Sequence, residues 1–251
     1  MEKKDLLKDV IKHIDIKSYN STELIDAMRN MSFTSRDTAR AADILMMMCK
    51  EKECTNILTL AGSTSAAGCM QVYVDMVRNK MIDVVVATGA SIIDMDLFEA
   101  LGFKHYIGEK ENVIADTTLR DLYIDRIYDT YIDEEELQAC DHTTFEIANM
   151  LEARPYSSRE FIYEIGKWLH DGHAVKKDSL IQTCYECGVP IFVPAFSDSS
   201  AGFGIGKHQW ERMQKGEKYL SIDSVKDFVE LTQIKMQAPE TGLFMVGGGA
   251  P

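Results

Sequence analysis

The sequence predicts an α/β fold, in which a mainly parallel sheet is flanked by helices and preceded by a helical N-terminal region. Four short segments of continuous apolar residues have the pattern of strands that are covered on both faces; they span 57–61, 84–87, 190–195 and 243–246. Each segment is followed by a turn rich in small residues. The first two start 27 residues apart, at 57 and 84, which is the length of a strand–helix–strand unit with parallel strands.

The first 52 residues form the predicted helical region. Apolar residues recur at helical spacing over 6–14 and predict a first helix. Asn20 and Thr34 are each followed three residues later by an acidic residue, a pattern that resembles the capping box at a helix start. We therefore expect a second helix to begin near Asn20 and a third near Thr34.

The remainder of the chain is predicted to continue without a linker, so that residues 1–251 form a single domain. A helix over 70–79 connects the first two strands, and a long acidic segment over 119–173 has helical character. There are only five prolines and no repeat or low-complexity tract. No stretch therefore has the composition of a flexible connection.

The charge of the chain argues against two classes of partner. Its 27 Lys and Arg residues against 40 Asp and Glu residues give a net charge of −13, which disfavours nucleic acids and anionic membranes because binding to them depends on basic side chains. No apolar run approaches the roughly 18 residues that span a bilayer, and the start lacks an apolar signal segment, so a cytoplasmic location is expected. Six dispersed cysteines suit a reducing compartment. Cys184 and Cys187 lack the second pair of a structural zinc site, so no metal is predicted.

Small residues at the ends of the four strands indicate a dinucleotide-binding site. The carboxyl ends of parallel strands meet at one edge of an open sheet, where such folds bind ligands. Small residues there let backbone N–H groups approach a phosphate, and the N-terminus of the following helix favours negative charge. The first turn, over 61–68, departs from G-x-G-x-x-G, so an ordinary dehydrogenase is not implied. The alternative is that these glycines only shape tight turns.

Three aspartates follow the strands and are candidate ligands of a ribose. Asp94 and Asp96 come shortly after the second strand, and Asp198 lies in the turn after the third. A carboxylate at this edge can accept hydrogen bonds from ribose hydroxyls. Asp94 and Asp96 can equally be acids favoured by a helix dipole, and Asp198 can cap a helix or hold a cation.

Six ordered stretches resemble the deoxyhypusine synthase family, and most closely its deoxyhypusine-synthase-like branch in bacteria and archaea. They include LTLAGSTSAAG and TGLFMVGGGAP and span 58–68, 84–108, 121–137, 154–162, 189–206 and 241–251. The resemblance implies a Rossmann-like α/β fold in which NAD accepts a hydride from a polyamine such as spermidine and later returns it. The aminobutyl group passes through an imine and an active-site lysine to an acceptor amine, either a protein lysine or a small diamine. Family members are usually homotetramers, with the site at a dimer interface.

The resemblance also implies which residues bind the cofactor. By position, the family's NAD contacts fall on Ala61, Gly62, Ala66, Thr88, Gly89, Ala90, Asp198, Gly247, Gly248 and Gly249. Either Asp94 or Asp96 is expected near the adenosine ribose, and the length of the loop leaves that choice open. Where the family has an aspartate that pairs with a spermidine amine, this chain has Phe203, whose ring attracts an ammonium less directionally than a carboxylate.

The family's lysine nucleophile lies in a Trp-Gly-Lys motif, in a segment that follows the position of Pro251. Neither Trp168 nor Trp210 is followed by Gly-Lys, so the catalytic lysine is expected beyond the sequence given. The predicted function is NAD-dependent aminobutyl transfer from a polyamine donor. The alternative is a truncated relative that binds NAD or assembles with a partner without catalysis.

Overall fold

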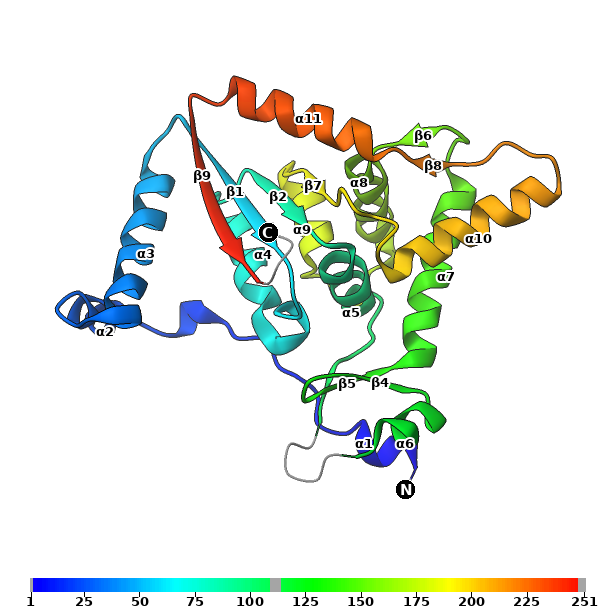
Figure 1. Cartoon of the computed structure of the whole chain (residues 1–251), viewed down its shortest axis with the longest axis horizontal. Helices are drawn as coiled ribbons and strands as arrows, with labels where there is room; N and C mark the ends of the chain where they lie inside the picture. Colours follow the sequence, from blue (N-terminus) through cyan, green and yellow to red (C-terminus); the bar gives the residue numbers. More distant parts are fainter. Residues whose placement is uncertain (1, 109–113, 248–251) are drawn as a thin grey trace.

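A parallel sheet of four strands lies at the centre of the molecule (Figure 1). The computed structural model describes residues 2–108 and 114–247. The strands are β1 (Cys54–Leu60), β2 (Val84–Ala87), β7 (Ile191–Phe192) and β9 (Glu240–Val246). They are the four strands that the apolar runs predict, and the α/β fold class is confirmed.

The order of the strands places a switch point next to the first strand. The sheet runs β7-β2-β1-β9, with every neighbouring pair parallel. After β1, the chain therefore adds β2 and then β7 on one side of β1, and it adds β9 on the other side. In open α/β sheets, ligands bind beyond the carboxyl ends of the strands at such a switch point.

Helices cover the sheet and join its strands. The helices of the described residues are α1 (Lys3–Leu6), α2 (Thr22–Met28), α3 (Phe33–Lys50), α4 (Met70–Arg78), α5 (Phe98–Ala100), α6 (Asp116–Asp121), α7 (Glu134–Met150), α8 (Ser158–Trp168), α9 (Leu180–Cys187), α10 (Ser200–Gln214) and α11 (Ser224–Gln237). Wider, π-helical turns occupy 65–69, 90–97 and 169–173. The predicted connecting helix is α4, and α2 and α3 confirm two of the three N-terminal helices.

The main hydrophobic core forms where α4, α8 and α9 pack together and against the sheet. Leu58 and Val85 of the sheet are completely buried, as are Val74 of α4 and Phe161 of α8. Each such side chain stabilises the fold by about 1.5–3 kcal/mol through burial. The expectation that the strands are covered on both faces is only partly met: β7 is buried throughout, whereas burial alternates along β1, and β9 leaves Leu243 and Met245 exposed.

The prediction of a helix over residues 6–14 is wrong. After the single turn of α1, residues 9–14 form an extended segment, which we call the N-terminal strap. Its backbone bonds to distant parts of the chain: Ile11 N donates to His105 O at 2.9 Å, and Ile14 N donates to Gly68 O at 2.9 Å. Since these N–H groups have distant partners, a helix of the same residues would lose both bonds.

A buried carboxylate anchors the strap to the rest of the fold. Glu99 Oε2 lies 2.6 Å from His13 Nε2 and 2.5 Å from Lys176 Nζ, and Glu99 Oε1 lies 2.9 Å from His105 Nδ1. Met70 N donates to the other ring nitrogen of His13 at 3.2 Å. Burial opposes the charge of Glu99, but His105, His13 and Lys176 outweigh it and hold its pKa well below the usual range.

The acidic segment over 119–173 is not wholly helical, which corrects a second prediction. It contains a hairpin of β4 (Ile124–Ile127) and β5 (Thr130–Asp133), to which β3 (Tyr106–Ile107) adds an antiparallel third strand. Tyr128 takes a left-handed conformation, with φ 55°, in the hairpin turn. A further two-stranded sheet pairs β6 (Pro155–Tyr156) with β8 (Ser221–Ile222). These strands are too short to show a clear alternation of apolar and polar residues.

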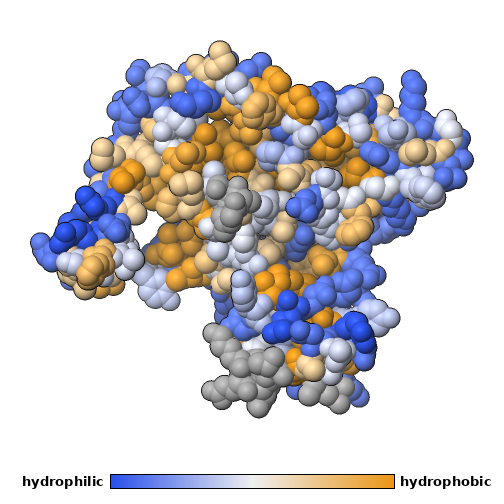
Figure 2. Space-filling model, viewed as in Figure 1, coloured by the Kyte–Doolittle hydropathy of each residue, from blue (hydrophilic) through white to orange (hydrophobic). Residues whose placement is uncertain are grey.

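The edge strand β9 exposes apolar side chains. Leu243 and Met245 are 53% and 64% exposed, and Met236 of the neighbouring α11 is 80% exposed. In the face shown in Figure 2, hydrophobic residues gather over β9 and α11. Within residues 2–108 and 114–247, no helix combines the length and the apolar character needed to cross a membrane.

Candidate functional site

A cavity of about 350 Å³ lies at the carboxyl ends of the parallel strands. This volume falls in the range of small-molecule and cofactor sites, about 300–1,000 Å³. The lining comes from the ends of β1 and β2 and from the segment after β7, and consists of Thr59, Leu60, Ala61, Val86, Ala87, Thr88, Gly89, Pro194, Ala195 and Asp198. Four of the predicted cofactor-binding residues, Ala61, Thr88, Gly89 and Asp198, therefore line one cavity.

Close backbone packing brings the strand ends together. Thr88 N donates to Leu60 O at 3.0 Å, and Ala61 N donates to Val246 O at 2.9 Å. Gly247 has φ 108°, and a Cβ atom on it would lie 1.8 Å from Ala61 O. Only glycine can therefore follow β9 where the chain passes the first turn.

The turn after β2 leads directly into the helical segment over 90–97, whose N-terminus borders the cavity. A Cβ on Gly89 would lie 2.3 Å from Ser199 Cβ, so glycine lets the turns after β2 and β7 meet. Ser91 Oγ donates to Gly62 O at 3.1 Å and ties this helix to the turn after β1. A helix N-terminus next to small residues is suited to an anion such as a phosphate.

Asp94 lies beside the start of α10, where Ser200 follows Asp198 by two residues. Ser200 N donates to Asp94 Oδ2 at 3.4 Å. Asp94 Oδ1 is buried and has no hydrogen-bond partner within the described ranges. Burial raises the pKa of Asp94 to about 7; the Ser200 N–H opposes this shift, and the nearby Asp141 carboxylate adds to it. The free oxygen is an acceptor that a ligand hydroxyl or ammonium can satisfy.

Asp96 points to a different part of the fold. Its two carboxylate oxygens accept hydrogen bonds from Leu180 N and Ile181 N, both at 2.8 Å, at the start of α9. Burial raises the pKa of Asp96 to about 6, against the effect of these two N–H groups. Asp96 is thus engaged in holding α9, whereas Asp94 faces the turn that contains Asp198.

The other predicted site residues lie outside the cavity lining. Ala66 is buried in the turn before α4, and Ala90 begins the helix after β2. Phe203 is 77% exposed on α10 and lines a separate hollow. Gly248 and Gly249 lie outside the described residues.

Sequence reasoning missed Asp141 and Ser200. Ser200 Oγ donates to Asp141 Oδ1, and burial raises the pKa of Asp141 to about 6, with Ser200 opposing the shift and Glu134 adding to it. Asp141 lies in the middle of α7, within the acidic segment, and no local motif distinguishes it from its solvated neighbours. Its proximity to Asp94 arises only when α7 packs along α10.

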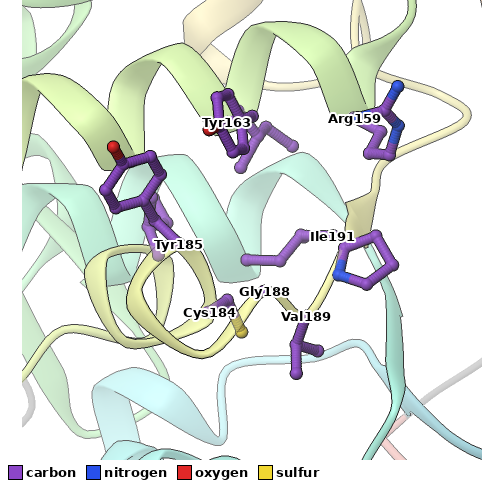
Figure 3. A pocket seen from close by; sticks show the side chains of 10 residues that line it. Arg159, Tyr163, Cys184, Tyr185, Gly188, Val189 and Ile191 are labelled. Atoms are coloured by element: carbon purple, nitrogen blue, oxygen red, sulfur yellow. The ribbon is translucent and has the colours of Figure 1, made fainter.

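A second hollow, of about 160 Å³, lies at the opposite end of β7 (Figure 3). Gly188, Val189 and the side chains of α8 and α9 surround it. Its single cationic group, Arg159, is paired with Glu230 through Nε and Nη2. Because this hollow is mostly apolar and far from the carboxyl strand ends, it offers little for cofactor chemistry.

The described residues contain no group of three or more His, Cys, Asp or Glu side chains arranged to hold a metal ion. Cys184 is buried and Cys187 is exposed, and both are free thiols.

Comparison with known proteins identifies the family. The family model for deoxyhypusine synthase matches residues 23–251. A deoxyhypusine synthase-like protein from Caulobacter vibrioides is 65% identical over 250 residues, covering 100% of this chain and 68% of the relative. The same kind of protein from Coxiella burnetii is 58% identical over 249 residues, covering 99% and 69%. A probable deoxyhypusine synthase 2 from Methanosarcina acetivorans is 39% identical over 238 residues, covering 95% and 66%.

A solved structure agrees with the fold. The crystal structure of a putative deoxyhypusine synthase from Entamoeba histolytica superimposes with a TM-score of 0.66 at 20% identity, covering 95% of this chain and 79% of that chain. At this identity the likeness concerns the fold alone. Together with the family match over residues 23–251, the sequence relatives establish that this chain belongs to the deoxyhypusine synthase family.

Proposed function

We propose that this chain binds NAD at the carboxyl edge of its parallel sheet and serves in aminobutyl transfer from a polyamine donor. One observation carries the proposal: Ala61, Thr88, Gly89 and Asp198 from three strand ends line one cavity of about 350 Å³ at the switch point of the sheet. The relatives support the transfer, since they are named deoxyhypusine synthase-like proteins.

The residues at this edge fit a dinucleotide. The N-terminus of the segment over 90–97 is suited to a phosphate. Asp198 lines the cavity, and Asp94 presents a buried oxygen without a partner among the described residues. Both can accept hydrogen bonds from ribose hydroxyls. When bound, NAD would supply a hydride acceptor for the carbon next to the donor amine.

The expected donor is spermidine or a related polyamine, and the acceptor is a small diamine or a protein lysine. The chain's contribution is to hold the donor amine next to the cofactor and to exclude water from the cavity, which is lined mainly by apolar groups. We also propose assembly as a homotetramer in the cytoplasm, which size-exclusion chromatography with light scattering would test.

Replacement of Asp198 tests the cofactor site. Asp198→Ala should weaken NAD binding about tenfold or more, because it removes a charged acceptor of hydroxyl donors. The matched control is Asp37→Ala, which removes an exposed aspartate of α3 that lies 3.6 Å from Arg40 and should leave NAD affinity unchanged. Isothermal titration with NAD measures both. An Asp198→Ala protein that folds and binds NAD normally would refute the assignment.

A second candidate function is NAD binding without transfer. It is favoured by one observation: none of the described residues that line the cavity is a lysine, and the transfer needs a neutral lysine at bonding distance. Incubation of the chain with NAD and labelled spermidine or putrescine separates the two. Released 1,3-diaminopropane or ammonia, or label passed to an acceptor amine, supports transfer. NAD binding with none of these products supports the binding protein.

A further inference from the structure

The N-terminal strap connects two parts of the fold that are distant in the sequence. On one side, Val10 forms an antiparallel bridge with Tyr106 of β3. On the other side, Ile14 N donates to Gly68 O at 2.9 Å. Gly68 belongs to residues 61–69, which connect β1 to α4 and which we call the β1–α4 turn. Figure 1 shows the strap, in blue, passing between the small antiparallel sheet and the start of α4.

The strap lies directly against the end of this turn. Gly68 has φ 93°, and an added Cβ there would lie 2.8 Å from Lys12 O. Only glycine therefore fits at this point, where the two backbones touch. Because this contact and the bond from Ile14 N act on the same residue, the position of the strap determines where the β1–α4 turn ends.

His13 adds a side-chain link between the strap and the first residue of α4. Met70 N donates to His13 Nδ1 at 3.2 Å, and His13 Nε2 lies 2.6 Å from Glu99 Oε2. Since Nδ1 accepts from a backbone N–H, it carries no proton, so the ring proton is on Nε2 and is donated to Glu99. Met70 is 1% exposed, and the side chains of His13 and Glu99 are 14% and 10% exposed. Water therefore has little access to replace either bond.

The carboxylate that orients His13 is itself held in place. His105 Nδ1 lies 2.9 Å from Glu99 Oε1, and the His105 side chain is completely buried. Lys176 Nζ lies 2.5 Å from Glu99 Oε2. In a histidine, the bond made by one ring nitrogen determines which nitrogen carries the proton. Glu99 thus keeps the His13 ring in the tautomer and orientation that offer Nδ1 to Met70 N.

The β1–α4 turn carries this constraint to the proposed cofactor cavity. Ala61, at its first position, lines the cavity. Within the turn, Ala67 N donates to Ser63 O at 2.9 Å. Cys69 N donates to Thr64 O at 3.0 Å. The end that the strap holds and the end that lines the cavity therefore belong to one bonded segment.

We infer that His13 is a positioning residue for the cofactor edge: by accepting from Met70 N, it fixes the β1–α4 turn in the arrangement that binds a dinucleotide. The effect on the dinucleotide rests on the proposed function, whereas the position of the turn does not. His13 lies outside the cavity lining, so it acts through the turn and not by contact with the ligand. A protein that populates its binding arrangement only in part binds its ligand more weakly in the same proportion.

Two substitutions of similar size separate the two bonds of His13. His13→Asn places an amide oxygen near the position of Nδ1 and keeps an acceptor for Met70 N, but its side chain is too short to reach Glu99. His13→Gln places an amide nitrogen near the position of Nε2 and keeps the bond to Glu99, but it leaves Met70 N without an acceptor. Isothermal titration of the intact chain with NAD should show about tenfold weaker binding for His13→Gln, the size expected when a buried donor loses its acceptor, and a change of less than about threefold for His13→Asn.

Asp223→Ala is the control for a loss of stability alone. The Asp223 carboxylate accepts from Val225 N at 3.0 Å at the start of α11, and removal of such a cap destabilises a helix. α11 leads into the amino end of β9, whereas the β1–α4 turn follows the carboxyl end of the parallel β1. Asp223→Ala should therefore lower the unfolding midpoint in urea and leave NAD affinity unchanged.

Hydrogen exchange in the chain without NAD tests the position of the turn by itself. The amides of Ala67, Cys69 and Met70 should exchange about tenfold faster in His13→Gln than in His13→Asn, because local opening governs their exchange. If His13→Gln does not fold, values close to those of the wild type in His13→Asn support the inference, and a loss of about tenfold in that variant refutes it.

Separate outcomes decide the inference and the proposed function. Equal NAD affinity and equal exchange in His13→Gln and His13→Asn overturn the inference. A loss of NAD affinity in Asp223→Ala that matches the loss in His13→Gln also overturns it, because general destabilisation would then explain both. If the unmodified chain does not bind NAD, the proposed function is overturned, and the exchange rates still decide whether His13 positions the turn.

Discussion

Replacement of Asp96 should destabilise the fold without a direct effect on the cofactor site. In Asp96→Ala, the N–H groups of Leu180 and Ile181 lose acceptors at 2.8 Å. Both residues are at most 1% exposed, so water cannot take the place of the carboxylate. A buried donor without a partner costs about 1–3 kcal/mol. Two such donors predict a fall of about 2–6 kcal/mol in the free energy of unfolding. At pH 7 the cost of ionising this buried carboxyl, whose pKa is raised from 3.8 to about 6, would offset about 3 kcal/mol of that fall; near pH 4 the folded carboxyl is protonated and the offset is small.

Urea denaturation followed by circular dichroism near pH 4 measures this loss. Asp96→Asn should fall between the wild type and Asp96→Ala, because its amide oxygen still accepts one of the two bonds. Asp94→Asn is the matched comparison, since the backbone bond that Asp94 accepts from Ser200 N is long, at 3.4 Å. If Asp96→Ala unfolds within about 0.5 kcal/mol of the wild type, as neutral surface substitutions do, then the two N–H bonds do not hold α9 and the reasoning fails.

Three further predictions follow from buried groups and close contacts. Glu99→Gln should lower the free energy of unfolding by about 3–5 kcal/mol in urea denaturation, because it removes one member of a buried ionic cluster; an unchanged midpoint would contradict this. Gly204→Ala should cost about 1–3 kcal/mol through overpacking, because an added Cβ would lie 2.0 Å from Thr144 Oγ1, whereas Gly206→Ala on the same helix, with open space around it, should stabilise by about 0.5–1 kcal/mol; thermal melting distinguishes them, and equal shifts would refute the contact. Since the folded pKa of Asp94 is about 7 and its ordinary value is 3.8, the folded state binds more protons between these pH values, and stability should fall by up to about 4 kcal/mol as pH rises from 4 to 8. Asp94→Asn should flatten that part of the curve, and an identical slope would show that other groups cause it.

The parallel sheet was predictable because its strands leave a direct mark in the sequence. Residues such as Leu58 and Val85 lie in short, mainly apolar runs, which are typical of strands in parallel sheets, and the run over 243–246 has this pattern although Leu243 and Met245 are exposed. The cavity was predictable for a related reason: parallel strands end at one edge, so the small residues after them must converge. The convergence of Thr88, Gly89 and Asp198 could therefore be predicted without knowing the strand order.

The errors have a different physical origin. The apolar residues of the strap have helical spacing, but the N–H groups of Ile11 and Ile14 bond to His105 O and Gly68 O, which are distant in the chain. A pattern of neighbouring residues gives no information on such distant partners. Asp141 was hidden for the same reason, since its proximity to Asp94 depends on how α7 lies against α10. The sequence could not show which of Asp94 and Asp96 faces the cofactor edge, because the two lie on different sides of one helix and their partners are distant in the chain. Only the structure shows that Asp96 binds the start of α9 and that Asp94 binds the start of α10.

The strap also changes where the folding unit begins. The family model starts to match at residue 23, which suggests that a shortened chain starting there would be sufficient. Such a chain would lack His13, so Glu99 would lose one of its three partners and Met70 N would lose its acceptor. It would also uncover Gly68, whose carbonyl accepts from Ile14 N. The boundary drawn by the family model therefore falls after residues that bond to the rest of the fold, and these contacts begin no later than Ile11, whose N–H donates to His105 O.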